Sequence, residues 1–560
     1  MLLTVSVGLP YFVLASTSPL LQSWYGRSRS GVYRLYAVSN LGSMAALLGY
    51  PLWIEPRWGT GLQLQSWSVG YACFAVLCGG AAWAQSRGRG AEIARGETDS
   101  SDTPGFRLQF TWLALPACAS LLLVTLTAHI TQNIAPIPLL WVLPLALYLL
   151  SFVVCFEREV WYSPRAFGSL AMVALGVGGY ALLAEGASPN LKVMIPLYLA
   201  VLFVLCMFCH GELARRKPAP ARLTEFYLLV SLGGALGSVL AALVAPRLFT
   251  GRYELPLAMV ACAALAWALA LRESWISGPL WAAMALALGG VTLIQVVQAA
   301  KARASLRNFY GTLTVHDFAS GENAVRFLFH GSIIHGAQFQ SESRRGEPTM
   351  YFGRESGAGL LLASMKGPRR IGIIGLGAGT LAAYGRRGDS YRFYELNPQV
   401  IEVARRDFRF LSDTAAGVEV IAGDGRLALE REAPQQFDVL AVDAFSGDSI
   451  PIHLLTREAF QLYLRHLKPD GVLAMHLTNT YLDLPPLAGR VAASVGLEAY
   501  LVESLATERT RLATASWMLA GRGRGWLESP ELRQAARPLP PRRDLPVWTD
   551  DYSNVFRILK

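Results

Sequence analysis

Three acidic residues follow apolar segments in the C-terminal half of the chain. Glu395 ends "SYRFYE", Asp424 follows "VEVIAG", and Asp443 ends "FDVLAVD". A carboxylate at the end of a strand can accept hydrogen bonds from both hydroxyls of a ribose, and another can accept from an adenine amino group. We assign Glu395 to the ribose and Asp424 to the adenine, so the pattern predicts a nucleoside site.

A glycine-rich turn precedes these acids. Gly375, Gly377 and Gly379 alternate with other residues directly after the apolar "RIGII", and Glu395 follows Gly375 by 20 residues. The turn reads G-x-G-x-G, whereas the dinucleotide fingerprint is G-x-G-x-x-G, and Thr380 stands where its last glycine would be. Together, the turn and the acids favour a binder of an adenosyl sulfonium compound over an NAD enzyme.

The elements that must position these residues alternate between strand and helix. Such alternation predicts a mainly parallel, doubly wound sheet, in which ligands bind beyond the carboxyl ends of the strands. Short strands joined by tight turns precede it from about residue 305. We therefore predict a Rossmann-like α/β domain over 366–560, preceded by a small β-domain over 301–365. The expected strands are 370–375, 390–396, 418–423, 437–445, 471–479, 498–504 and 514–522, with helices at 398–408 and 456–467.

The first 300 residues have the composition of a membrane protein. The chain is 53% hydrophobic and 16% charged, whereas soluble domains carry about 25% charged residues. A spanning helix needs about 20 mostly apolar residues. We predict a polytopic α-helical membrane domain over 1–300, with a polar linker at 86–109. About ten spans are expected, at 2–17, 36–54, 66–85, 110–131, 137–156, 165–184, 193–211, 225–245, 254–271 and 278–299.

Charge and the N-terminus indicate the partners and the location. The net charge of +10 fits basic cytoplasmic loops, because no basic run is interleaved with aromatic residues as in a nucleic-acid surface. The lipid bilayer is therefore the expected partner, and nucleic acid is not. The first span lacks the basic start and the cleavage site of a signal peptide, and its abrupt beginning at Met1 suggests that further spans precede it. We predict a multi-pass membrane protein and make no prediction of its oligomeric state.

The side of the membrane on which the C-terminal half lies stays open. Lys and Arg residues concentrate in alternate loops, and with ten spans this bias places the C-terminal half outside. The use of an adenosyl donor, which is made in the cytoplasm, instead predicts that the C-terminal half lies on the cytoplasmic side.

All seven cysteines lie in the apolar half. They do not form two C-x-x-C pairs, so no zinc or other metal site is predicted. Cys206 and Cys209 are three residues apart in an expected span, and their expected role is helix packing.

The segment 305–525 resembles the spermidine synthase (aminopropyltransferase) family, which places a small β-domain before an adenosyl-binding Rossmann-like sheet. The whole chain resembles bacterial membrane proteins described as fused MFS/spermidine synthase-like, and this resemblance implies a location in the bacterial cytoplasmic (inner) membrane. The segments that carry this resemblance include "PLLWVLPLALYLLSF", "CHGELARRKPAPARLTEFYLLVSLGGALGS" and "VDAFSGDSIPIHLLT".

The resemblance implies particular roles. Asp443 would accept the proton of an attacking amine, and Tyr351, in "EPTMYFGRESG", corresponds to an active-site tyrosine of the family. A carboxylate and a tyrosine hydroxyl can orient an amine and take its proton. Because the sulfonium is itself an activated leaving group, neither a metal nor a tightly bound cofactor is needed. The co-substrate would be decarboxylated S-adenosylmethionine or S-adenosylmethionine, with an amine or another small molecule as acceptor.

Two positions depart from the family's pattern. Ala378 and Ser446 stand where the family has aspartates that help to hold cationic amines. Asp448 and Asp551 are the candidate substrate-binding acids that remain, the latter in a C-terminal segment, "PVWTDDYSNVF", that could close over the site. His476, after the fifth strand, borders the same cleft.

Three functions are compatible with these features. The first is a membrane-bound transferase that moves an aminopropyl-type group from decarboxylated S-adenosylmethionine to an amine. The second is an S-adenosylmethionine-dependent transferase with an envelope or lipid acceptor, whose donor carboxylate Ala378 would not repel. The third is a polyamine-type transporter with a ligand-sensing soluble domain. The missing aspartates favour the second or the third function. The presence of Asp443 favours the two enzymes.

Overall fold

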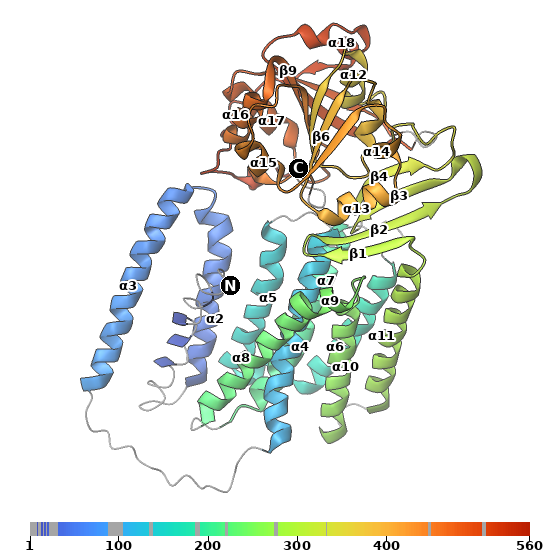
Figure 1. The fold of residues 1–560 in the computed structure, drawn as a ribbon. Coiled ribbons are helices and arrows are strands. Elements are labelled where there is room, and N and C mark those ends of the chain that lie inside the picture. Colours follow the sequence, from blue (N-terminus) through green and yellow to red (C-terminus); the bar gives the residue numbers. More distant parts are fainter. Residues whose placement is uncertain are drawn as a thin grey trace. The chain divides into compact units, whose positions relative to one another are not determined.

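A computed structural model describes the following residues: 8, 13–14, 16–17, 20–21, 32–87, 105–133, 138–184, 191–218, 222–273, 278–331, 333–445, 450–506 and 511–560. The chain forms two compact units (Figure 1). The membrane unit comprises residues 1–57, 61–131 and 137–297, and the soluble unit comprises 58–60, 132–136 and 298–560. Each unit is described by itself.

The membrane unit is a set of long apolar helices. They are α2 (Val32–Gly49), α3 (Thr60–Arg87), α4 (Phe106–Asn133), α5 (Pro138–Glu157), α6 (Pro164–Ala184), α7 (Leu191–Arg215), α8 (Leu223–Val239), α9 (Ala245–Leu248), α10 (Glu254–Glu273) and α11 (Gly278–Ala299). A π-helical turn at Leu240–Val244 joins α8 to α9.

Eight helices in the described part of the chain are long and apolar enough to cross a membrane. They correspond to the eight expected spans from 66–85 to 278–299. The expected span 36–54 forms α2 and a π-helical turn at Tyr50–Ile54 but is not among the eight. Most of the expected span 2–17 and most of the linker 86–109 lie outside the described residues.

The soluble unit begins with a four-stranded antiparallel sheet, in the stretch where a small β-domain is predicted. Its strands are β1 (Ala304–Asn308), β2 (Gly311–Phe318), β3 (Val325–His330) and β4 (Ile333–Phe339). They follow one another in the sheet in chain order.

An eight-stranded mixed sheet follows, in the order β12-β10-β11-β9-β8-β5-β6-β7. The strands are β5 (Arg370–Ile374), β6 (Ser390–Glu395), β7 (Gly417–Ala422), β8 (Phe437–Val442), β9 (Leu467–His476), β10 (Glu498–Ser504), β11 (Ala515–Gly521) and β12 (Arg537–Pro538). The strands from β9 to β7 are parallel, and β11, β10 and β12 extend the sheet with antiparallel pairs. This is the Rossmann-like α/β fold that the sequence predicts.

The strand order places a switch point beside β5. The chain runs from β5 outward to β6 and β7 and then returns to β8 on the other side of β5. In open α/β sheets, ligands bind at the carboxyl ends of the strands where the order reverses in this way. The ends of β5, β6 and β8 are therefore where a site is expected.

Apolar residues on both faces of the central strands hold the sheet between two cores. In β8, Val439 and Ala441 join one core, and Leu440 and Val442 join the other. Central parallel strands are buried on both faces and read as continuous apolar runs. The helices of this unit are α12 (Gly357–Ser364), α13 (Pro398–Arg406), α14 (Phe410–Asp413), α15 (Gly425–Arg431), α16 (Arg457–His466), α17 (Leu484–Ser494) and α18 (Pro530–Ala535).

Candidate active site

The glycine turn after β5 is built so closely against neighbouring backbone that it excludes side chains. Gly375 has φ +100°, and a Cβ atom there would lie 2.2 Å from the carbonyl oxygen of Asp443. The backbone N–H of Gly375 donates to the carbonyl of Tyr394 at 2.8 Å, and the N–H of Asp443 donates to that of Ile374 at 2.8 Å. The turn thus joins the ends of β5, β6 and β8.

A five-residue 3₁₀ helix, Thr380–Tyr384, follows the turn. Dinucleotide-binding folds hold the pyrophosphate at the N-terminus of an α-helix in this position. The short 3₁₀ helix is therefore in accord with an adenosyl ligand that has no pyrophosphate.

A cavity of about 340 Å³ opens at the carboxyl ends of these strands. Six of the nine predicted site residues line it: Gly375, Gly377, Glu395, Asp424, Asp443 and Tyr351. They come from β5, β6, β7 and β8 and from the loop after β4, so residues far apart in sequence face one space. The cavity lies at the switch point.

The other three predicted residues do not line the cavity in the structure. Gly379 has φ +83° and precedes the 3₁₀ helix, where a Cβ atom would meet Leu411 at 3.0 Å, so its role is to shape the turn. Asp551 is exposed and is not among the lining residues. Asp448 lies outside the described residues.

Both carboxylate oxygens of Glu395 are held by backbone N–H groups. Oε2 accepts from Leu376 at 3.0 Å, and Oε1 accepts from Asn397 at 2.8 Å. Burial raises the pKa of Glu395 and nearby Asp443 adds to the rise, while these backbone donors oppose it. Each oxygen can accept further hydrogen bonds, so the carboxylate is oriented towards the cavity with acceptor capacity for a pair of hydroxyls.

Asp424 caps α15 with one oxygen and contacts a histidine with the other. Oδ1 accepts from the backbone N–H of Leu427 at 2.9 Å, and Oδ2 lies 3.2 Å from His453 Nε2. The hydrogen bond with His453 is the main cause that lowers the pKa of Asp424, and partial burial opposes it. A helix cap fixes the position of the carboxylate at the cavity edge, where its predicted contact with an adenine amino group stays a prediction.

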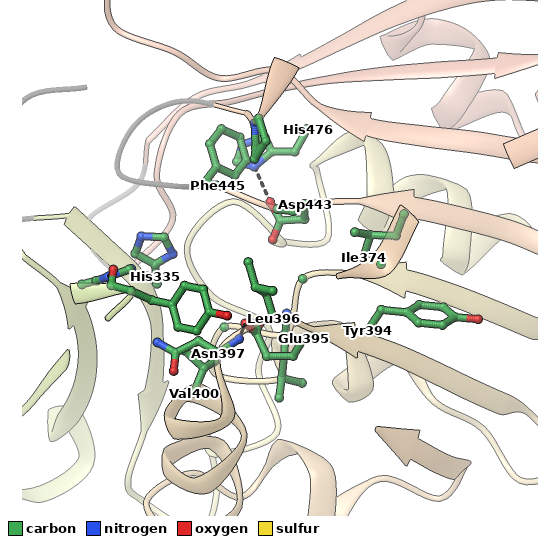
Figure 2. A pocket seen from close by; sticks show the side chains of 18 of the residues that line it. His335, Ile374, Tyr394, Glu395, Leu396, Asn397, Val400, Asp443, Phe445 and His476 are labelled. Atoms are coloured by element: carbon green, nitrogen blue, oxygen red, sulfur yellow. Dashed lines mark hydrogen bonds and ion pairs between the residues drawn. The ribbon is translucent and has the colours of Figure 1, made fainter. Parts of the chain in front are cut away.

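Asp443 is paired with His476 (Figure 2). Asp443 Oδ1 lies 2.6 Å from His476 Nδ1. In the parallel register of β8 and β9, Val442 lies opposite Met475. Asp443 and His476 directly follow these two residues and are therefore neighbours. Burial raises the pKa of the Asp443 carboxyl, and the hydrogen bond from His476 opposes the rise. A carboxylate with a raised pKa beside a cavity is a candidate general base.

Aromatic rings fix the orientation of His476. Its ring stacks on Trp517 with centroids 4.9 Å apart and an interplanar angle of 14°, and it contacts Tyr351 and Phe445 at 4.8 and 4.9 Å. Its Nε2 lies 2.7 Å from the hydroxyl of Thr478. With both ring nitrogens engaged and both ring faces packed, His476 can hold Asp443 in a single direction.

Tyr351 reaches the cavity from the loop after β4. Its hydroxyl donates to the carbonyl of Ile334 at 3.3 Å, and its own carbonyl accepts from Trp517 Nε1 at 3.0 Å. Tyr351 lines the cavity, and the role of its hydroxyl in orienting an amine, which the resemblance implies, stays a prediction.

Two residues that line the cavity each have a buried polar atom with no hydrogen-bond partner among the described residues. The atoms are His335 Nε2 and Asn397 Nδ2. Burial, with a smaller effect of His330, lowers the pKa of His335 to about 3, so its ring is neutral at physiological pH. An unpaired buried polar group costs about 1–3 kcal/mol. Because protein encloses both atoms, contact with a bound ligand would require these side chains to move.

Ala378 does not face the cavity. It is 1% exposed, and a Cβ atom at Gly336 of β4 would lie 2.5 Å from its Cβ. Its side chain therefore packs against the small sheet, and it is not among the lining residues. The expectation that alanine here relieves repulsion of a donor carboxylate is wrong for this structure, because the side chain points elsewhere.

The C-terminal segment is fastened to the α/β fold. Trp548 is 2% exposed in one of the two cores, and Asp550 pairs with Arg426 at 2.8 Å. Asp550 Oδ1 also accepts from the hydroxyl of Thr456, the N-cap of α16, at 2.8 Å. Of the two adjacent acids, the structure gives Asp550 these anchoring contacts.

The sequence did not single out several residues that line the cavity. Asn397 and the aromatic pair Phe309 and Tyr310 are examples, and His335, for which the sequence suggests a structural role, also lines the cavity. Asn397 stands two residues after Glu395, just before a proline, which is a helix-start signal and could have located it. The aromatic pair lies in the turn between β1 and β2, and its place at the cavity depends on how the small sheet meets the large one.

Comparisons with known proteins concern part of the chain. No family model matches it. Over 118 residues it is 35% identical to a protein named polyamine aminopropyltransferase from Vibrio vulnificus (strain CMCP6), covering 20% of this chain and 39% of that protein. Over 158 residues it is 25% identical to a probable polyamine aminopropyl transferase from Bifidobacterium longum (strain NCC 2705), covering 27% and 33%. The chain thus spans less than two fifths of these curated relatives.

Solved structures of low identity are also similar. A probable spermidine synthase from Corynebacterium glutamicum matches with 16% identity, a TM-score of 0.34, and coverage of 43% of this chain and 96% of that one. The spermidine synthase of Thermotoga maritima matches with 19% identity, a TM-score of 0.32, and coverage of 43% and 81%. The chain's relatives and structural neighbours are therefore proteins of spermidine synthase or aminopropyltransferase type, similar over only part of its length.

Proposed function

We propose that the soluble unit is a spermidine-synthase-like transferase that moves an aminopropyl-type group from decarboxylated S-adenosylmethionine to an amine. The observation that carries the proposal is the position of Asp443. This buried carboxylate, oriented by His476, faces the same cavity as Glu395 and the glycine turn. A base and a nucleoside site within one cavity are what such a transfer requires.

The reaction needs a neutral amine and a place for one proton. The amine nitrogen attacks the carbon next to the sulfonium, a C–N bond forms, and the C–S bond breaks. The sulfur leaves as a neutral thioether, and the positive charge passes to the new ammonium group. Asp443 takes the proton from that nitrogen, before or as the bond forms. Tyr351 orients the amine, and no metal takes part in these steps.

Glu395 and Asp424 fit the nucleoside part of the donor. Glu395 presents a carboxylate whose direction two backbone N–H groups set, and charge-assisted hydrogen bonds to ribose hydroxyls are stronger than neutral ones. Asp424, after the neighbouring strand β7, would accept from the adenine amino group. The donor is a co-substrate that enters and leaves with each turnover.

One observation supports a second candidate, an S-adenosylmethionine-dependent transferase with an envelope or lipid acceptor. Among the described residues that line the cavity, the acids are Glu395, Asp424 and Asp443, and the first two are assigned to the donor. A cationic polyamine would thus meet only one carboxylate. Much of the remaining wall is apolar or aromatic, including Phe309, Leu313, Leu328, Ile333 and Val400. Such a wall suits an acceptor with an apolar part.

Binding and transfer measurements distinguish the two candidates. We expect calorimetry of the purified full chain to show tighter binding of decarboxylated S-adenosylmethionine than of S-adenosylmethionine, and mass spectrometry to show an aminopropylated amine. Preferred binding of S-adenosylmethionine would select the second candidate. Binding of neither donor nor of the thioether product would refute both.

Replacement of Glu395 tests the nucleoside site. We expect Glu395→Ala to lose roughly 2–4 kcal/mol of donor affinity, because it removes charge-assisted acceptors for the ribose. Titration calorimetry measures the loss. The matched control is Glu402→Ala, an acid on α13 that is 52% exposed and pairs with Arg406, and its affinity should equal that of the wild type. An unchanged affinity in Glu395→Ala would place the ligand elsewhere.

The location of the soluble unit follows from the proposed donor. We propose that the chain is anchored in the bacterial cytoplasmic membrane by a domain of MFS type within residues 1–300, and that residues 301–365 and 366–560 lie in the cytoplasm, where the donor is made. A reporter fused after Lys560 that is active only in the cytoplasm should therefore be active. A reporter active only outside would contradict this location and would support the orientation given by ten spans.

A further inference from the structure

Three buried cysteines from three helices of the membrane unit meet at one point. Cys118 lies on α4, Cys209 on α7 and Cys262 on α10, and their sulfur atoms all lie within 4.8 Å of one another. Cys118 is 6% exposed, and the other two are fully buried. All three are free thiols. Three sulfur ligands therefore face a common centre.

The spacing of the sulfur atoms suits one ion at that centre. At a bond length of about 2.3 Å, an ion in the plane of three sulfurs holds them about 4.0 Å apart, and a trivalent metalloid, whose lone pair makes the complex pyramidal, holds them closer. The cluster would need to contract by roughly 1–1.5 Å to reach the pyramidal geometry. A disulfide, by contrast, brings two sulfurs to about 2.05 Å and leaves the third unused.

The surroundings of the cluster select the charge of the ion. Six residues one turn away on these helices are apolar, with exposed fractions of 0%: Leu115 and Leu122, Leu205 and Leu213, Ala258 and Ala266. One turn from Cys209 on α7 also lie the buried thiol Cys206 and the buried carboxylate Glu212, whose charge is paired with Arg215 and Arg216. A net charge in such surroundings is costly. Three thiolates with a monovalent ion carry a charge of −2, with a divalent ion −1, and with a trivalent ion zero. The neutral complex is therefore favoured.

We propose that Cys118, Cys209 and Cys262 form a three-sulfur site for a trivalent thiophilic metalloid, of which arsenite is the testable example. Arsenous acid is uncharged, as the three thiols are. Each As–O bond is replaced by an As–S bond, and each thiol proton leaves with a hydroxyl group as water. Three waters are released, the product is neutral, and the oxidation state of arsenic and sulfur does not change.

The spacing of the cysteines predicts no metal site, because they do not form paired C-x-x-C motifs. Such motifs bring together ligands that are close in sequence. Cys118, Cys209 and Cys262 are far apart in the chain, and only the packing of α4, α7 and α10 brings them together. The role in helix packing that was assigned to Cys209 is the competing explanation, and it predicts no bound ion.

The test uses the full chain, purified in detergent and freed of reductant, with arsenite as the probe. We expect gel filtration and elemental mass spectrometry to find one arsenic per chain, and X-ray absorption to find three sulfur neighbours. Cys209→Ser should lose the bound arsenic. The control Cys155→Ser, which removes a thiol that is 1% exposed on α5, should retain it.

Several outcomes would overturn the proposal. They are no bound arsenic in the wild type, fewer than three sulfur neighbours, or equal binding by Cys209→Ser. Binding of Cu⁺ or Zn²⁺ without arsenite would overturn the trivalent assignment. The X-ray absorption result on the wild type decides the question even if Cys209→Ser fails to fold.

Discussion

Asp443→Asn should bind donor almost normally and lose about 10²–10⁴-fold in turnover, which is the usual contribution of a general base. Asparagine keeps the size of the side chain and can still pair with His476, but it cannot take the proton of the amine. Titration calorimetry measures binding, and single-turnover transfer measures the rate. Asp470→Asn, a change at an exposed position on β9, is the control and should keep full turnover.

Two results would assign Asp443 another role. Turnover that persists in Asp443→Asn would show that a different group takes the proton. Loss of donor binding with Asp443→Asn would show that the carboxylate holds the ligand. The second result would favour the sensing function over the two transferase functions.

The dependence of turnover on pH gives an independent check. The base must be ionised, and burial raises the pKa of Asp443. Turnover in the wild type should therefore rise with pH through a pKa above the usual value of about 3.9. The hydrogen bond from His476 lowers this pKa, so in His476→Phe the rise in turnover should occur at higher pH. If the rise occurs at the same pH as in the wild type, His476 has only a packing role.

The sequence predicted the main features of the soluble fold because each depends on local pattern. Apolar runs such as "FDVLAV" become central strands because both faces are buried, as the alternation of Val439 and Leu440 between two cores shows. Acids that follow such runs must lie at one edge of a parallel sheet. Glu395, Asp424 and Asp443 therefore line one cavity, as their spacing suggested.

Other features depend on strand order and on the direction of individual side chains, which spacing does not contain. The link between Asp443 and His476 requires β8 and β9 to be neighbours in a given register. Ala378 follows the glycine turn yet faces Gly336 of the small sheet. The cysteine cluster requires three helices to pack together. In each case a contact between distant segments decides the role.

Outside the cavity, the contact between Arg369 and Asp389 at the start of β5 should be the one most sensitive to substitution. Arg369 is 2% exposed and Asp389 4% exposed. Asp389 accepts from the backbone N–H of Arg369 at 2.9 Å and from its Nε at 3.0 Å, and it also accepts from the N–H of Arg386 at 2.9 Å. Arg369 donates to the carbonyl of Tyr384 at 2.8 Å. These bonds hold β5 and the segment before β6 on either side of the glycine turn.

Asp389→Asn should destabilise this part of the soluble unit by about 3–5 kcal/mol, because it leaves the Arg369 charge buried without its partner. Hydrogen exchange of peptides from β5 and β6 in the full chain should become about 10²–10⁴-fold faster, since exchange reports the free energy of local opening. Asp544→Asn breaks an Arg–Asp pair that is exposed on both sides, and it should leave this exchange unchanged.

The same contact should make the soluble unit sensitive to acid. Burial raises the pKa of Asp389, but the hydrogen bonds from Arg369 and from the backbone of Arg386 outweigh it, so the pKa lies below its usual value of 3.8. A carboxyl whose pKa is lower in the folded state stabilises that state above its unfolded pKa. The stabilisation is lost as the pH falls through the folded pKa. Wild-type exchange, corrected for its intrinsic dependence on pH, should therefore accelerate below about pH 4, and Asp389→Asn should lack this acceleration. An acceleration of equal size in the variant would show that other carboxyl groups cause the acid sensitivity.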